Sequence, residues 1–159
     1  MFSTRTTELD GSLVVVGAPI EAAFALFSPL GERAWVPGWE PEFIHPPGSA
    51  WKPGLVFRTH TGHGEALWVV AALDRLAHKV EYLRFEAERY VVKVRVACSV
   101  RSRQVTDVRV TYMFIGLSDV GNEEIASMSP DAHAERMLKW QGWIAQYLER
   151  QSTLKAEQP

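Results

Sequence analysis

Cysteine is almost absent from this chain, since Cys98 is the only one in 159 residues. A disulfide within the chain is therefore excluded, and a chain of this length can bury a sufficient core without one. Cys98 lies in an alternating apolar run, where cysteine behaves as a small hydrophobic residue. We therefore expect a reducing, cytoplasmic location and no catalytic thiol.

Long hydrophobic runs and an excess of one charge are also missing. The longest uncharged apolar stretch, residues 66–73, is far too short to span a bilayer, and residues 1–12 contain no apolar segment typical of a signal peptide. The formal net charge is −2, with acidic and basic residues interleaved. This pattern argues against a nucleic-acid-binding or anionic-membrane surface. We expect neither nucleic acid nor a membrane span, and a homodimer is left open.

The common motifs of catalysis are missing as well. No Ser-His-Asp pattern, phosphate-binding loop or dinucleotide fingerprint occurs, and the glycine-containing stretch 116–124 is interpreted as a loop. His60 and His63, together with Glu65 and His45, are the one set that resembles a metal site. Histidines three residues apart on a strand point to opposite faces. We therefore expect no metal and no other cofactor.

What the sequence does contain is a series of strands followed by one long helix. Period-two alternation predicts strands over 9–17, 55–62, 65–75, 79–87, 90–102 and 105–118, and their hairpin-like spacing predicts an antiparallel sheet. Two short helices are predicted after the first strand, over 19–27 and 31–36. Ser129 and Pro130 are typical of a helix start, and the apolar stripe that follows predicts a helix from Asp131 to about Thr153.

This order of elements predicts an α+β fold in a single domain, residues 1–159, with an ordered core over about 8–153. An antiparallel sheet with one apolar face must be covered, and the last helix is the only long amphipathic element in the sequence. We expect a curved sheet wrapped around this helix. Because a straight helix cannot touch a strongly curved sheet everywhere, a cavity should remain at one end.

At this point the chain resembles a known superfamily. The stretches "ERAWVPGWEPEF", "VTYMF" and "MLKWQGWIAQYL", with the strand pair around Phe57 and Trp68, resemble the START-related, Bet v 1-like superfamily (SRPBCC). The nearest branch is the polyketide cyclase/dehydrase-like proteins. The resemblance implies a helix-grip fold with a deep hydrophobic cavity between sheet and helix. It implies no particular reaction, since the same cavity serves carriers, sensors and enzymes.

The stretch "WVPGWEPEF", residues 35–43, places Trp35 and Trp39 in a loop that two prolines and a glycine make irregular but stiff. Either the two indoles plug the core or they line the cavity. We expect Trp39 to lie at the cavity rim, with its N–H free to meet a ligand carbonyl. In the same region, Glu32 and Arg33 are expected to pair locally.

The predicted ligand-binding residues combine this loop with the inward faces of the strands and the final helix. Of the helix tryptophans, one of Trp140 and Trp143 should reach the cavity and the other should seal the sheet edge. The expected lining is Trp35, Trp39, Phe57, Trp68, Tyr82, Tyr112, Phe114, Met137 and Trp140.

Three functions remain open at this stage. The first is binding of a small hydrophobic, aromatic or polyketide-like molecule, as a carrier or sensor. The second is a cyclase or dehydratase that uses acid–base residues in the cavity, for which the candidates are His60, Tyr82, Arg84 and Tyr112. The third is a protein-interaction domain of the chaperone-activator type.

Overall fold

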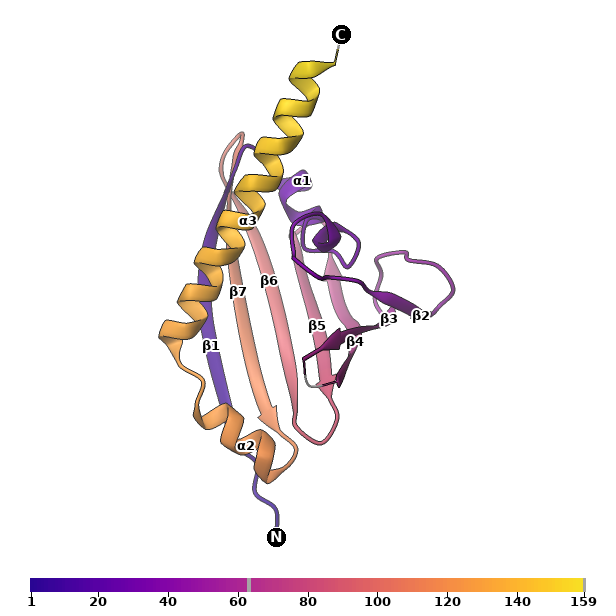
Figure 1. Cartoon of the computed structure of the whole chain (residues 1–159), viewed down its shortest axis with the longest axis vertical. Helices are drawn as coiled ribbons and strands as arrows, with labels where there is room; N and C mark the ends of the chain where they lie inside the picture. Colours follow the sequence, from indigo (N-terminus) through magenta and orange to yellow (C-terminus); the bar gives the residue numbers. More distant parts are fainter. Residues whose placement is uncertain (63, 159) are drawn as a thin grey trace.

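The computed structural model describes residues 1–62 and 64–158. Within these residues one antiparallel sheet has seven strands in the order β1-β7-β6-β5-β4-β3-β2 (Figure 1). The strands are β1 (Thr6–Val16), β2 (Glu42–His45), β3 (Val56–Thr61), β4 (Gly64–Asp74), β5 (Lys79–Glu86), β6 (Tyr90–Ser102) and β7 (Val105–Gly116). The predicted antiparallel sheet and its order along the chain are confirmed.

Helical elements flank this sheet at both ends of the chain. They are α1 (Ile20–Ala25), the 3-10 helix η1 (Gly31–Ala34), α2 (Asp119–Ala126) and α3 (Pro130–Glu157). The two short helices predicted after the first strand are α1 and η1. Ser129 caps α3, because its side chain accepts a hydrogen bond from the backbone N–H of Ala132 at 3.1 Å. Among the described residues, no helix is both long and apolar enough to cross a membrane.

The sheet is curved, and bulges contribute to this curvature. The register shifts between Val70 and Ala72 in β4, and again between Val100 and Ser102 in β6. An extra residue on one strand of a pair bends that strand and increases its twist. In Figure 1, α3 runs along the β1 side of the sheet, and the chain that follows α1 lies toward the β3–β4 side.

Helix α3 packs directly on β1, and the contact depends on a glycine. Buried His133 and Met137 face Gly11, where a Cβ atom would lie 2.8 Å from a carbon of each side chain. Farther along, the backbone N–H of Val14 donates to Oε1 of Gln141 at 2.9 Å, which satisfies part of the open edge of β1. The helix is thereby fixed over one edge of the sheet rather than over its centre.

The prediction of a loop over residues 116–124 was wrong, because α2 begins at Asp119. Ser118 is its N-cap and accepts a hydrogen bond from the backbone N–H of Gly121 at 3.0 Å. Gly121 is required by packing, since a Cβ there would lie 1.7 Å from the carbonyl oxygen of Arg89. The glycine therefore marks a close backbone contact inside a helix. Helix α3 also continues beyond the predicted end near Thr153, to Glu157.

Candidate functional site: a cavity between the sheet and the C-terminal helix

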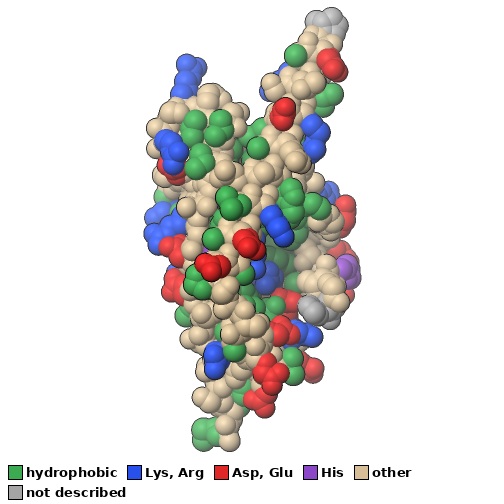
Figure 2. Space-filling model, turned by 60° about the vertical axis from the view of Figure 1, so that its left-hand side comes forward, with side chains coloured by type: hydrophobic (Ala, Val, Ile, Leu, Met, Phe, Trp, Pro, Cys, Tyr) green, Lys and Arg blue, Asp and Glu red, His purple; other side chains and the backbone are tan. Residues whose placement is uncertain are grey.

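A cavity of about 490 Å³ lies where α3 and the sheet diverge. In the space-filling view the molecule is hollowed beside α3, and hydrophobic and basic side chains are visible there (Figure 2). The lining side chains come from α3, from β3 to β7 and from the segment around η1. They are Pro29, Glu32, Val36, Trp39, Phe57, Trp68, Tyr82, Arg84, Val94, Val96, Tyr112, Ala132, Glu135, Arg136, Lys139, Trp140 and Trp143.

One wall of the cavity is a cluster of aromatic rings on β3 and β4. Phe57 and Trp68 are directly paired in the register of these strands, and their rings stack with centroids 5.6 Å apart at an interplanar angle of 7°. Trp39 packs edge-on against Trp68 at 5.5 Å. The indole N–H of Trp68 donates to Thr59 at 2.9 Å, which fixes the ring. This wall is therefore rigid, apolar and preformed.

The two loop tryptophans take different places. Trp35 is buried, and its N–H donates to the carbonyl of Leu26 at 2.7 Å, so this residue plugs the core beneath the loop. Trp39 is half-buried and lines the cavity. Its N–H donates to the carbonyl of Pro29 at 2.8 Å. The expectation that this N–H is free for a ligand carbonyl was wrong, because a main-chain carbonyl already accepts it.

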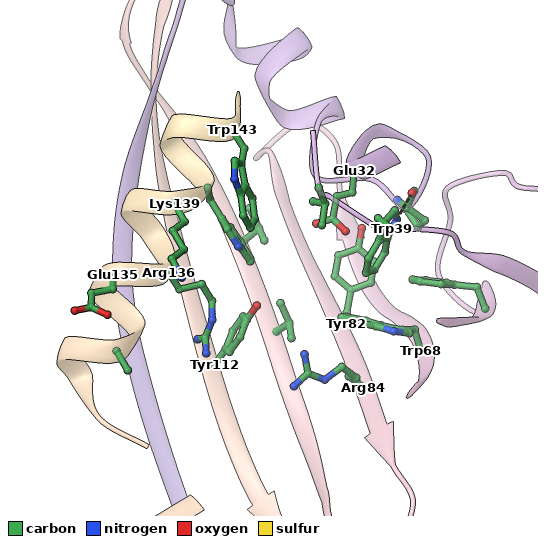
Figure 3. A pocket seen from close by; sticks show the side chains of 17 residues that line it. Glu32, Trp39, Trp68, Tyr82, Arg84, Tyr112, Glu135, Arg136, Lys139 and Trp143 are labelled. Carbon is green, nitrogen blue, oxygen red and sulfur yellow. Dashed lines mark hydrogen bonds between the residues drawn. The ribbon is translucent and has the colours of Figure 1, made fainter. Parts of the chain in front are cut away.

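The helix contributes the opposite wall. Trp140 and Trp143 both line the cavity, so the expected division of labour between them was wrong. Trp140 also packs edge-on against Trp35 at 5.6 Å and against Tyr112 at 6.3 Å. Figure 3 shows Trp143, Lys139 and Arg136 projecting from successive turns of α3 toward the sheet. The helix therefore offers both aromatic and basic groups to the same space.

Tyr82, on β5, lies at the base of the aromatic wall. Its hydroxyl donates to the carbonyl of Phe27 at 2.7 Å, and its ring packs edge-on against Phe57 and Trp68. Burial raises the pKa of Tyr82 well above its usual value, and the negative charge of Glu32 raises it further. Tyr82 is therefore a hydrogen-bond donor rather than a phenolate at neutral pH.

Arg84 follows two residues later on the same strand and also faces the cavity. Its guanidinium lies over the Trp68 ring at 5.5 Å and reaches Glu86 with one terminal nitrogen at 3.3 Å. Its Nε is buried and has no hydrogen-bond partner among the described residues. A buried guanidinium N–H without an acceptor is costly, so this group is a candidate for contact with a ligand.

A second arginine enters from α3. Arg136 donates through Nη1 to Nδ1 of His133 at 2.8 Å, and Nε2 of His133 contacts the carbonyl of Val110 at 3.0 Å. Since a carbonyl only accepts, Nε2 carries a proton; since a guanidinium only donates, Nδ1 carries none, and the imidazole is neutral. Burial lowers the pKa of His133, the carbonyl of Val110 raises it, and the charge of Arg136 lowers it. The two arginines both lie close to the ring of Tyr112, at 5.0 Å for Arg136 and 6.0 Å for Arg84.

Tyr112 itself is buried, and both cations lie over its ring. Burial raises its pKa, and the positive charges of Arg84 and Arg136 oppose that effect. In Figure 3 the arginines approach Tyr112 from different elements, Arg136 from the helix and Arg84 from the sheet. The structure thus brings together three residues whose separations along the chain hide their proximity.

Glu32 is an acidic residue of the cavity. From the sequence, its carboxylate was expected to pair with Arg33. The expectation was wrong: Arg33 instead lies 3.9 Å from Glu40, and Glu32 lines the cavity on the η1 side (Figure 3). Burial raises the pKa of Glu32 well above its usual range. The cavity therefore holds one carboxyl group that favours its protonated form.

Four of the residues predicted for the site lie outside the cavity lining. Phe114 is buried against Tyr90 at 5.3 Å, and Met137 is buried against β1 at Gly11. Trp35 belongs to the core, as described above. His60 is exposed near the end of β3, because the alternation that turns Phe57 and Thr59 inward turns His60 outward.

Ten residues of the lining are absent from the predicted site, and those with charged or aromatic side chains are Glu32, Glu135, Arg136, Lys139 and Trp143. A signal for two of them was available, because Arg136 and Trp143 share a helix face with Trp140 at spacings of four and three. No signal in the sequence indicated Glu32. Among the described residues no cluster of His, Cys, Asp and Glu could hold a metal ion; His63 lies outside them.

Many solved structures share this architecture, and the three described here are distant from the chain in sequence. Norcoclaurine synthase from Thalictrum flavum has a TM-score of 0.66 at 11% identity, over 96% of this chain and 99% of that chain. Ginseng major latex-like protein 151 from Panax ginseng has a TM-score of 0.63 at 14% identity, over 92% of this chain and 97% of that chain. Ara h 8.0201 has a TM-score of 0.62 at 15% identity, over 92% of this chain and 99% of that chain. Identities of this size establish the fold alone.

The chain therefore has the helix-grip fold of these Bet v 1-like structures, and the fold that the resemblance in sequence implied is confirmed. No family model and no curated protein sequence matches the chain. Its assignment to the polyketide cyclase/dehydrase-like branch stays a prediction.

Proposed function

We propose that this protein binds a small aromatic molecule in the cavity between the sheet and α3, as a carrier or sensor. The observation that carries the proposal is a preformed cavity of about 490 Å³ whose walls include four tryptophans, Trp39, Trp68, Trp140 and Trp143. Ligand pockets commonly have roughly 300–1,000 Å³ and combine apolar walls with a few polar groups. This cavity has both features.

Its wall chemistry favours a flat aromatic molecule over a fatty acyl chain. Trp39 meets Trp68 edge-on, and the Trp68 ring stacks on Phe57. Aromatic rings prefer stacked or edge-to-face contact with other rings, which is worth about 0.5–1.5 kcal/mol beyond area burial. Because the rings are held by hydrogen bonds and by each other, little side-chain entropy is lost when a ligand enters.

A structure with the same fold supports this choice of ligand class. Norcoclaurine synthase from Thalictrum flavum has been solved in complex with dopamine and hydroxybenzaldehyde, at a TM-score of 0.64 and 11% identity to this chain. Both compounds are small aromatic molecules with polar substituents. The fold can therefore accommodate such molecules, although the identity is too low to transfer a ligand or a reaction.

Titration with a panel of naphthol, flavonoid and fatty-acid probes tests the proposal. We expect saturable binding of the aromatic probes by calorimetry, with quenching of tryptophan fluorescence, and weaker binding of the fatty acids. Trp39→Phe removes part of one wall. Since one aromatic contact is worth about 0.5–1.5 kcal/mol, its affinity should fall about 3- to 10-fold.

Tyr147→Phe is the control, because Tyr147 lies on α3 outside the residues that line the cavity. It should bind the aromatic probes as wild type does. Absence of saturable binding by every aromatic probe would refute the proposal. Equal affinity and equal quenching in Trp39→Phe and wild type would show that the bound probe does not touch Trp39. If Trp39→Phe lowers the melting temperature but leaves probe binding unchanged, Trp39 serves the core and not the binding site.

An acid–base enzyme of the cyclase or dehydratase type is the second candidate. The observation that favours it is the pairing of a carboxyl group of raised pKa, Glu32, with the buried phenol of Tyr82 in one cavity. Short β-keto aromatic substrates, followed by mass spectrometry, test this alternative. Turnover that disappears in Glu32→Gln while probe binding is retained would establish an enzyme, and binding without turnover would favour the carrier or sensor.

A further inference from the structure

We propose that the ligand of this cavity carries a carboxylate, and that Arg84 and Arg136 together bind it beside Tyr112. This inference rests on the proposed function and deepens it, since it names the chemical class of the ligand. The aromatic body would lie against the tryptophan walls, and the acid group would sit between the two guanidinium groups.

The first observation is that Arg136 has an uncharged partner. Its Nη1 contacts Nδ1 of His133, whose other nitrogen contacts the carbonyl of Val110. A histidine held in this way is neutral, so it accepts a hydrogen bond but cancels no charge. Arg136 forms no ion pair with an acidic residue in the described part of the chain. Its full positive charge is therefore directed at the cavity.

The second observation is that Arg84 is only partly satisfied. The buried carboxylate of Glu86 forms an ion pair with one terminal nitrogen of Arg84 at 3.3 Å. The buried Nε of Arg84 has no hydrogen-bond partner among residues 1–62 and 64–158. A guanidinium group presents five N–H donors in a fixed fork that matches a carboxylate. An acid group in the cavity could accept from the donors that Glu86 leaves unused.

The third observation is the placement of the two arginines relative to each other. Both lie over the ring of Tyr112, at 5.0 Å and 6.0 Å, although one comes from α3 and the other from β5 (Figure 3). Because each guanidinium group lies near the same ring, their like charges repel each other in this partly desolvated site. An anion between them relieves that repulsion and forms charge-assisted hydrogen bonds with both.

The acidic residues of the cavity do not cancel this positive charge. Glu135 belongs to the cavity lining but is exposed, and its side chain projects toward the solvent side of α3 in Figure 3. Glu32 lies on the far side, and its burial favours the neutral carboxyl group. Lys139 lines the cavity and is exposed like Glu135, so these two opposite charges offset each other. The charges that remain are the two arginines against the single carboxylate of Glu86, which selects for an anionic ligand.

The test uses three probes that share one ring system and differ in charge: 2-naphthoate, 2-naphthamide and 2-naphthylmethylamine. Binding to the whole chain is measured by calorimetry at pH 7. We expect 2-naphthoate to bind at least about 10-fold more tightly than the amide, because charge-assisted hydrogen bonds are roughly twice as strong as neutral ones. The amine should bind most weakly.

Variants then assign this preference to the two arginines. Arg136→Gln should lower the affinity for 2-naphthoate about 10-fold or more and leave the affinity for the amide within about 2-fold. Because Arg84→Gln alone would leave Glu86 buried without its partner, the paired variant Arg84→Gln/Glu86→Gln is used at that position. Arg150→Gln, an exposed change on the same helix, is the control and should behave as wild type.

Each outcome decides the matter. A carboxylate preference that disappears in both arginine variants supports the inference. Equal binding of the carboxylate and the amide in wild type, or tightest binding of the amine, overturns the inference and leaves aromatic binding intact. Equal losses for carboxylate and amide in Arg136→Gln also overturn it. If none of the three probes binds, this inference is wrong, and the titration with naphthol and flavonoid probes decides the proposed function separately.

Discussion

At the residue scale, the chemistry of the cavity is decided by which polar groups already have partners. The indole N–H groups of Trp39 and Trp68 donate to Pro29 and Thr59, so these residues offer a ligand only their rings. Arg84 keeps a buried N–H without an acceptor in the described structure, and Glu32 forms no ion pair there. Specificity is therefore expected from the charged residues and affinity from the aromatic ones.

Glu32 leads to a prediction about pH and stability. Its usual pKa is near 4.5, and burial raises the native value well above this. The native state therefore binds more protons than the unfolded state between these two pKa values, and stability is lost as the pH rises through the native pKa. Each unit of difference costs about 1.4 kcal/mol at high pH. Glu32→Gln removes this penalty and should be more stable than wild type at pH 8.

The measurement is the melting temperature of both proteins between pH 4 and pH 8. The advantage of Glu32→Gln should be absent at the acidic end, below the unfolded pKa, and should grow as the pH rises. A variant that is less stable than wild type at pH 8 would show that the native site stabilises the charged carboxylate, for instance by attraction to the arginines. A difference that does not change with pH would contradict the raised pKa itself.

At the scale of elements, the position of α3 determines that there is a cavity at all. The helix lies on β1 because Gly11 leaves space for His133 and Met137, and Gln141 bonds the backbone of Val14 in the same strand. Tyr112, on β7, packs beside His133 with ring centroids 5.1 Å apart. The aromatic cluster covers β4 and β5, and the space between this cluster and α3 is the cavity.

Gly11→Ala should therefore weaken the packing of α3 on β1 and destabilise the protein. The added Cβ would lie 2.8 Å from carbons of both His133 and Met137, so both side chains must move. Overpacking of this kind costs about 1–3 kcal/mol, which for a chain of this size lowers the melting temperature by roughly 2–4 °C per kcal/mol. Thermal unfolding followed by circular dichroism measures the effect.

Gly142→Ala is the matched control, because nothing lies within 4 Å of the added Cβ on the same helix. Replacing this glycine within α3 should stabilise the protein by about 0.5–1 kcal/mol, through the better helix propensity of alanine. The two substitutions are thus expected to have opposite signs. If Gly11→Ala is as stable as wild type, the helix does not depend on this contact.

The elements also show what the sequence could predict and where it failed. Period-two alternation placed the long strands, and the stripe through Met137 and Ile144 placed α3, because both patterns reflect burial on one face. Helix α2 was missed because its glycine, Gly121, was taken as a loop residue. The glycine is instead imposed by the backbone at Arg89, a contact that is 32 residues distant in sequence and carries no local signal.

At the scale of the whole molecule, the site joins residues from both ends of the chain. Tyr82, Arg84 and Tyr112 could be assigned to inward faces from strand alternation alone. Glu32 could not, because it follows a short helix whose direction depends on packing. The proximity of Arg84 and Arg136 could not be predicted either, since it depends on where α3 crosses the sheet. The fold was thus more predictable than the site, whose key pairings are long-range.

The most direct test of the account is a crystal structure of this protein with 2-naphthoate. We expect the naphthalene ring to lie in the cavity against Trp68 and the helix tryptophans. We also expect the carboxylate to lie within hydrogen-bonding distance, about 2.7–2.9 Å, of guanidinium nitrogens of both Arg84 and Arg136. A ligand bound outside the cavity, or a carboxylate directed to the solvent with the two arginines unoccupied, would contradict it.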